Sequence, residues 1–191
     1  MRKHLSRVMA ALLVLAMALT MLPVVSAAKE RFTATPIDGI PESGQTFVIY
    51  SAPAGGVFSP EASGGAVGVS AASGSEESAN LTVQTGAGAY QAVKNADGTY
   101  YLTCGGQYLT VDSAEKLTFE NEPKSGSSMS SKWKIADAGK DYDGFSIASA
   151  EVKYNNYEIF LEFYTSFKAW TYKPNSDWSI FVFRFFSVDG T

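Results

Sequence analysis

Histidine and cysteine are almost absent from this sequence of 191 residues, which contains one of each, His4 and Cys104. Because His4 lies near the N-terminus, the rest of the chain has no imidazole base, no histidine-containing triad and none of the commonest metal ligand. A single cysteine cannot form an internal disulfide, so stability must come from packing. Cys104 has no histidine to activate it, and we expect a buried residue without a catalytic role.

Long apolar runs are also absent, except at the N-terminus. Basic residues in the first seven positions precede an apolar run over 8–22, Pro23 ends the run, and small residues follow at 25–27. This arrangement is typical of a secretory signal peptide and is short for a membrane span. We therefore predict a signal peptide over 1–27 and a secreted protein, extracellular or at the cell surface. An uncleaved N-terminal anchor is the alternative.

Basic residues are fewer than acidic residues. The chain has 15 Lys and Arg against 19 Asp and Glu, and three of the basic residues lie in the predicted signal peptide. The remaining 164 residues (191 − 27) therefore carry 12 basic against 19 acidic residues, a formal charge of −7 (12 − 19). An acidic, histidine-free domain is a poor candidate for binding nucleic acid or an anionic membrane. We predict neither partner after signal cleavage.

Composition changes along the rest of the chain. Two prolines and several polar residues in 28–44 predict a leader or linker, and 45–191 is predicted to form one module. Within that module, 51–89 is rich in Ala, Gly and Ser, and Phe58 is its only aromatic residue. Two interpretations are open: a disordered linker, or short strands joined by Gly/Ser loops.

A pattern of four short strand-like runs occurs three times. The opening runs of the three units are 47–50, 100–103 and 145–148, and the aromatic-led closing runs are 90–93, 133–136 and 181–184. Three four-stranded units predict an all-β domain, almost free of helix, with a β-trefoil-like barrel that leaves no exposed sheet edge. The run at 47–50 is expected to pair near the closing strand over 181–186. A β-sandwich is the alternative fold.

The stretch FLEFYTSFKAWTY at 160–172 contains six aromatic residues in thirteen positions. Five of them have the spacing of one helical face, but Phe, Tyr, Thr and Trp are weak helix formers and no N-cap precedes them. The repeat instead predicts a hairpin. Its strands are expected at 158–164 and 168–173, with a turn at 165–167.

Aromatic residues carry the functional prediction. The residues expected in the barrel interior are Trp133, Phe145, Phe181, Phe183 and Phe185. The residues that do not alternate into that core are Tyr154, Tyr157, Tyr164, Phe167, Trp170, Tyr172 and Trp178. Tyr and Trp present a flat apolar face with a polar edge, which suits stacking on sugar rings. Tyr164, Trp170 and Tyr172 are therefore the predicted ligand-binding residues, and packing against the barrel cap is the alternative role for such rings.

Acidic residues offer the remaining candidates for chemistry. The pairs are Glu120 with Glu122, Asp141 with Asp143, and Glu158 with Glu162. The first two pairs do not satisfy the ligand spacing of an EF-hand, and a turn accounts for Asp143 followed by glycine. The third pair leaves a carboxylate-pair glycosidase as an alternative, although solvated strand faces explain it equally. We predict no metal site, no cofactor and no catalytic residue.

Three stretches carry a family resemblance: TFVIYSAPAGGVFS, YYLTCGGQYLTV and FLEFYTSFKAWTYKPNSDWSIFVFRFFSVDG. They resemble an accessory β-rich module of exported multidomain metallophosphoesterase and 5'-nucleotidase-type surface proteins of gut Gram-positive bacteria, over about 45–189. In such proteins a separate segment carries the Asp, His and Asn metal ligands. The resemblance therefore implies the accessory module without its enzyme, either free-standing or truncated, and a separate catalytic domain as one partner.

The sequence thus predicts an exported, non-catalytic binding module whose partner is a glycan or another cell-surface ligand. A structural accessory domain that docks on a phosphoesterase or nucleotidase domain is the first alternative. A carboxylate-pair glycosidase is the second.

Overall fold

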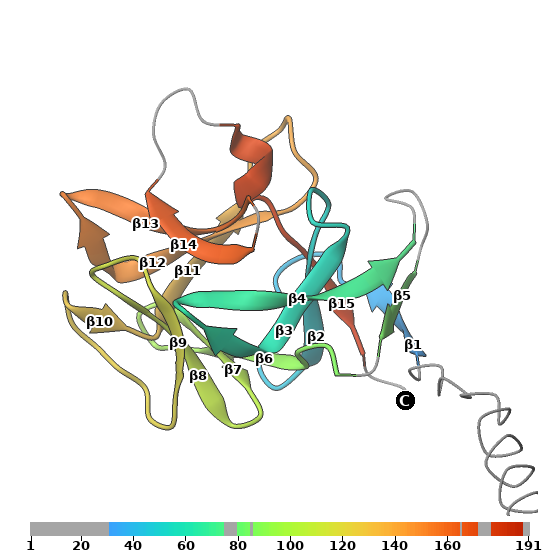
Figure 1. The fold of residues 1–191 in the computed structure, drawn as a ribbon, viewed down its shortest axis with the longest axis horizontal. Helices are drawn as coiled ribbons and strands as arrows, with labels where there is room; N and C mark the ends of the chain where they lie inside the picture. Colours follow the sequence, from blue (N-terminus) through green and yellow to red (C-terminus); the bar gives the residue numbers. More distant parts are fainter. Residues whose placement is uncertain (1–30, 75–79, 85, 165, 172–176, 189–191) are drawn as a thin grey trace, which may run out of the picture.

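The computed structural model describes residues 31–74, 80–84, 86–164, 166–171 and 177–188 (Figure 1). These residues form fifteen strands and one short 3-10 helix, η1 (Trp178–Phe181). The described part of the protein is therefore all-β with almost no helix, as the sequence predicts. No helix among the described residues is both long and apolar enough to span a membrane.

Short strands follow one another with antiparallel pairing throughout. In chain order they are β1 (Arg31–Pro36), β2 (Thr46–Ser51), β3 (Gly56–Ser63), β4 (Ala66–Ser73), β5 (Leu81–Gln84), β6 (Tyr90–Lys94), β7 (Tyr100–Cys104), β8 (Gln107–Asp112), β9 (Leu117–Glu120), β10 (Met129–Ser130), β11 (Lys132–Asp137), β12 (Phe145–Tyr154), β13 (Tyr157–Phe163), β14 (Phe167–Thr171) and β15 (Arg184–Ser187). Buried and exposed side chains alternate along β7 and β14, as expected for strands with one face on a core.

The strands close on themselves. Eleven of them form a closed barrel in the order β2–β6–β7–β11–β12–β13–β14–β4–β5–β1–β15, and β15 returns to β2. Strand β3 pairs with both β2 and β4 and so divides this circuit into two rings. In Figure 1, β1 and β5 lie on one side of the molecule and β8 to β14 on the other, with β2, β3 and β4 between them. Closure leaves fewer strand edges open to unwanted pairing.

Each ring encloses its own hydrophobic core, and β2 contributes to both. Phe47 and Ile49 belong to the larger core, whereas Val48 and Tyr50 belong to the smaller one. Successive side chains of a strand point to opposite faces, so a strand shared by two cores must be apolar at every position. This explains the uninterrupted run FVIY, which does not alternate as the run of a half-exposed strand would.

The strand pairings confirm one structural prediction and decide between two open interpretations. Residues 47–50 pair with the last strand, in a register that places Arg184 opposite Tyr50 and Ser187 opposite Phe47. The Ala/Gly/Ser-rich segment 51–89 contains β3, β4 and β5, so its described residues form strands and not a disordered linker.

The first unit differs in detail from the expected repeat. After β3 the chain forms β4, which pairs with β3 as a hairpin. Residues 81–84 form a further strand, β5, which pairs with β1 and with the end of β4. The predicted leader, 28–44, contains β1, which pairs with β5 and β15 and buries Ala34 in the smaller core.

An ion-pair network fixes the long connection between β9 and β11. The Glu151 carboxylate accepts hydrogen bonds from Ser125 Oγ at 2.9 Å, Gly126 N at 2.8 Å and Ser130 Oγ at 2.8 Å, and Lys132 Nζ lies 3.2 Å away. Partial burial raises the pKa of Glu151, but these hydrogen bonds outweigh it and lower the pKa from 4.5 to about 2. The ionised carboxylate therefore stabilises the folded state.

We expect Glu151→Gln to lower the free energy of unfolding at pH 7 by about 1.5–3 kcal/mol, the usual range for hydrogen bonds to a charged group. Because the folded-state pKa is depressed, this contribution is complete above about pH 4.5 and is lost as the pH falls towards about 2. Thermal unfolding of both proteins between pH 7 and pH 2 should show a difference in Tm that narrows over this interval. A difference that is constant with pH would contradict the assignment.

Candidate functional site

The predicted aromatic hairpin is present and consists of β13 and β14. The two strands pair from Phe163 opposite Phe167 to Ile159 opposite Thr171, and residues 164–166 connect them. The hairpin prediction is therefore confirmed, with a connection that begins one residue earlier than expected. Residue 165 lies outside the described residues.

The two faces of this hairpin have different environments. The inner face packs on the larger core and carries Ile159, Leu161, Phe163, Phe167 and Ala169. The outer face is defined by the cross-strand pairs Phe160 with Trp170 and Glu162 with Lys168. Directly opposite residues of an antiparallel pair share one face and have Cβ atoms roughly 4.5–5.5 Å apart. We call Phe160, Glu162, Lys168 and Trp170, together with Tyr164, the hairpin platform; within it Trp170 and Tyr164 are exposed and Glu162 is buried.

Trp170 is the exposed aromatic residue at one end of the hairpin platform, with 43% of its surface accessible. Its cross-strand neighbour Phe160 contacts Trp178 and Phe181 of η1, with ring centroids 5.5 and 6.0 Å apart. The Trp178 indole Nε1 donates a hydrogen bond to Ala138 O at 3.0 Å, which fixes that ring. Trp170 thus stands beside an anchored aromatic layer while much of its own surface remains open to solvent.

Tyr164 lies at the other end of the hairpin platform and is 76% exposed. It is four residues from Phe160 along the chain, a separation of about 13 Å in an extended strand. Its ring therefore does not form one stack with Trp170; the Glu162–Lys168 pair lies between the two positions. Tyr172, the third predicted binding residue, lies outside the described residues.

Glu162 is a buried carboxyl within the hairpin platform. Burial raises its pKa, the nearby carboxylate of Glu115 raises it further, and Lys168 opposes the shift. Glu115 lies in the β8–β9 turn and accepts hydrogen bonds from both the backbone N and the Oγ1 of Thr171. This contact ties the end of β14 to a turn from another part of the barrel, so the platform has a fixed position.

Most predictions about the aromatic residues agree with the structure. Trp133, Phe183 and Phe185 are buried in the larger core, and Phe145 is half-buried against it. Phe181 is also buried, but not in the barrel interior as predicted: it lies in η1 and packs on Phe160 and Trp178 on the outer face of the hairpin. Tyr154, Tyr157, Tyr164 and Trp170 are exposed.

Phe167 contradicts the prediction that it lies outside the core. It is fully buried, and its ring centroid is 3.8 Å from that of Phe58. Phe167 has the same parity along β14 as Ala169 and Thr171, which also face inward. This alternation was visible in the sequence and would have placed the ring correctly.

The two members of the third acidic pair lie in different environments. Glu158 is exposed and pairs with Lys134 at 3.2 Å, whereas Glu162 is buried. Among the residues that the structure describes, no group of three or more His, Cys, Asp or Glu side chains is placed to hold a metal ion. Cys104 is buried as predicted, and burial raises the pKa of its thiol.

The fold and the hairpin platform define an all-β closed-barrel domain with an outward aromatic surface. Comparisons with known protein families, with curated proteins and with solved structures found no match to this chain.

Proposed function

We propose that this protein is an exported, non-catalytic binding module that binds a glycan of a cell surface through the hairpin platform. The observation that carries this proposal is the position of Trp170, half-exposed on an outward face beside the anchored ring of Phe160. An exposed Trp is an apolar surface with one polar edge, which suits the C–H face of a sugar ring. The ring is placed by strand pairing before any ligand arrives, so little conformational entropy is lost on binding.

The β-trefoil-like arrangement belongs to the same proposal. In each unit the opening strand pairs with both the second and the closing strand of that unit: β2 with β3 and β6, β7 with β8 and β11, and β12 with β13 and with Phe183. The closing strands β6, β11 and β15 also pair with the opening strand of the next unit. This repetition supports three related units, to which β1 and β5 add the smaller ring.

Export and cell-surface location complete the proposal. They rest on the signal-like pattern in 1–27, which lies outside the described residues. The resemblance to accessory modules of surface phosphoesterases and nucleotidases supports the same location, and it makes a separate catalytic domain a further proposed partner.

The binding experiment is a glycan array followed by titration calorimetry with the glycans that bind. We expect Trp170→Ala to weaken binding by about 1–3 kcal/mol, as truncation of an aromatic anchor does. Its Tm should change little, because the ring is half-exposed. Tyr164→Ala should also weaken binding, but only of glycans that are long enough to reach both ends of the platform.

Tyr157→Ala is the matched control. Tyr157 is an aromatic residue of β13, 61% exposed, at the end of the hairpin away from the turn, three residues before Phe160 and outside the platform. We expect unchanged glycan binding for this variant. Equal binding by wild type and Trp170→Ala, or a large fall in Tm for Trp170→Ala, would refute the proposed site.

A further inference from the structure

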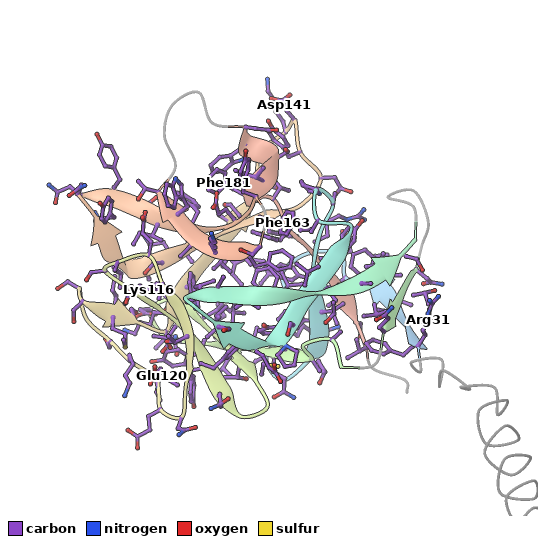
Figure 2. The ribbon with its side chains drawn as sticks, in the orientation of Figure 1. Arg31, Lys116, Glu120, Asp141, Phe163 and Phe181 are labelled. Carbon is purple, nitrogen blue, oxygen red and sulfur yellow. The ribbon has the colours of Figure 1, made fainter. Side chains whose placement is uncertain are left out.

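Two hollows flank the loop between β11 and β12, on the far side of η1 from the hairpin platform. One has a volume of about 280 Å³ and is bordered by Tyr50, Pro53 and Ser179; the other has a volume of about 550 Å³ and is bordered by Ile37 and Phe185. Tyr142, Asp143 and Arg184 line both hollows and form the ridge between them. Figure 2 places Asp141 at the tip of this loop, beside the short helix that carries Phe181. Ligand sites in proteins typically measure ~300–1,000 Å³, so the pair of hollows is large enough for a small ligand.

The ridge has a fixed geometry. The Arg184 guanidinium lies 3.5 Å from the Asp143 carboxylate and sits over the Phe186 ring at 5.5 Å from its centroid. Strand pairing places Arg184 directly opposite Tyr50. Arg184 is thus held by three neighbours, and the exposed Asp143 carboxylate beside it adds acceptors to the donors of the guanidinium.

The loop itself is docked tightly on the segment before β15. Phe145 and Phe183 exchange two backbone hydrogen bonds of 2.8 Å, and Ala138 N donates to Gly144 O at 3.0 Å. Gly144 has φ +153°, and a Cβ there would lie 2.6 Å from Phe183 O, so only glycine allows this close approach. The loop therefore holds Tyr142 and Asp143 in place before a ligand binds.

We infer that these hollows form a second glycan subsite, which takes uncharged sugar residues of the same oligosaccharide that the hairpin platform binds; this inference rests on the proposed function. One hydroxyl of a vicinal diol donates to the Asp143 carboxylate while its neighbour accepts from the Arg184 guanidinium. The exposed ring of Tyr142 offers a stacking surface beside them. Three further carboxylates border the hollows, at Asp38, Asp137 and Asp141, and disfavour acidic sugars.

The short helix η1 connects the two parts of the extended site. Trp178 packs on Phe160, the platform ring opposite Trp170, and the next residue, Ser179, borders the smaller hollow. These contacts relate Trp170, through Phe160 and η1, to the hollow that Tyr142 lines. A disaccharide is too short to contact both places, so occupancy of the second subsite should depend on chain length.

The test is calorimetric titration of the purified full-length secreted protein with cellobiose, cellotetraose and cellohexaose, with the matching N-acetylated chito-oligosaccharides, and with a galacturonate hexamer. We expect affinity for the neutral sugars to rise with chain length, and Tyr142→Ala to remove that rise, which is a loss of about 5- to 150-fold for the hexamers. Tyr142→Phe should retain most of the affinity because it keeps the ring. Lys140→Ala, in the same loop but outside both hollows, should behave as wild type.

The outcomes separate this inference from the proposed function. Unchanged affinity of Tyr142→Ala for the hexamers, together with a loss for Trp170→Ala, overturns the second subsite and leaves the hairpin platform intact. Binding of the galacturonate hexamer as tight as that of the neutral hexamers also overturns the subsite as described. No effect of Trp170→Ala on any sugar that binds, or no binding of any of these sugars, overturns both.

Discussion

Replacement of Trp133 by alanine is expected to lower the free energy of unfolding by about 3–5 kcal/mol, the usual cost of truncating a large core aromatic. Trp133 is fully buried in the larger core. Its strand, β11, pairs with β7 on one side and β12 on the other, so neighbouring backbone cannot easily collapse into the space left behind. Its indole Nε1 also donates a hydrogen bond of 2.9 Å to Leu109 O. Alanine has no side-chain donor to replace it.

Two variants separate the contributions to this loss. Trp133→Phe keeps most of the apolar volume but removes the donor to Leu109 O, and should cost about 1–3 kcal/mol. Trp170→Ala truncates the same type of side chain on the hairpin platform and should cost much less, because the ring is half-exposed. Urea unfolding of the three variants measures these losses of unfolding free energy, and the loss for Trp133→Ala should be the largest. Equal losses for Trp133→Ala and Trp170→Ala would contradict the distinction between core and surface.

Phe58→Ala is expected to cost a similar amount, about 3–5 kcal/mol, for a different structural reason. Phe58 is the one aromatic residue in the Ala/Gly/Ser-rich segment, and it is fully buried. Its ring packs on Phe167 of the hairpin, on Tyr90 and on Phe183, with centroids 3.8, 6.1 and 5.5 Å away. It therefore joins strands from the beginning, middle and end of the chain in one cluster.

Val69→Ala is the matched control for Phe58→Ala. Val69 lies on β4 directly opposite Phe58 in the strand pairing, but it is 43% exposed. Its truncation should change the free energy of unfolding by less than about 0.5 kcal/mol, as is usual for surface positions. Chemical denaturation measures the free energy of unfolding of both variants. A loss below about 1 kcal/mol for Phe58→Ala would show that the low-complexity segment is not part of the cooperative core.

Local sequence patterns were sufficient for much of the fold. Turn residues followed by short aromatic runs located most strands, and the pairing of 47–50 with the last strand followed from the need to close the barrel. The hairpin of β13 and β14 was predictable because weak helix propensity and the repeat both favoured strands. Each of these features depends on residues that are neighbours in the sequence or on the closure of the whole sheet.

The smaller ring was less predictable. Strand β1 has the sequence RFTATP, in which only Ala34 is buried, and its polar composition resembles that of a leader. It is a strand because β5 and β15 are available on either side, which is a tertiary effect that local propensity does not report. Strand β4 was missed as the partner of β3 because its sequence, AVGVSAAS, consists mostly of small residues with weak alternation.

The two candidate sites also differ in how far the sequence predicted them. The outward position of Trp170 followed from alternation along β14, because Ala169 and Thr171 on either side face inward. The ridge of Tyr142 and Arg184 could not be predicted, because these residues are 42 positions apart (184 − 142) and meet through the bridge between Phe145 and Phe183. Neither residue belongs to a recognisable motif, so only the fold brings them together.

The central claim is that Trp170 contacts a glycan on the outer face of the hairpin, and nuclear magnetic resonance of the tryptophan indoles tests it most directly. The chain has three tryptophans, and their Nε1–H signals can be assigned with single substitutions. On titration with an array-positive glycan, we expect the Trp170 signal to shift progressively to saturation. The Trp133 signal should stay in place because its indole is buried and bonded to Leu109 O. Saturation of binding with an unmoved Trp170 signal would contradict the claim.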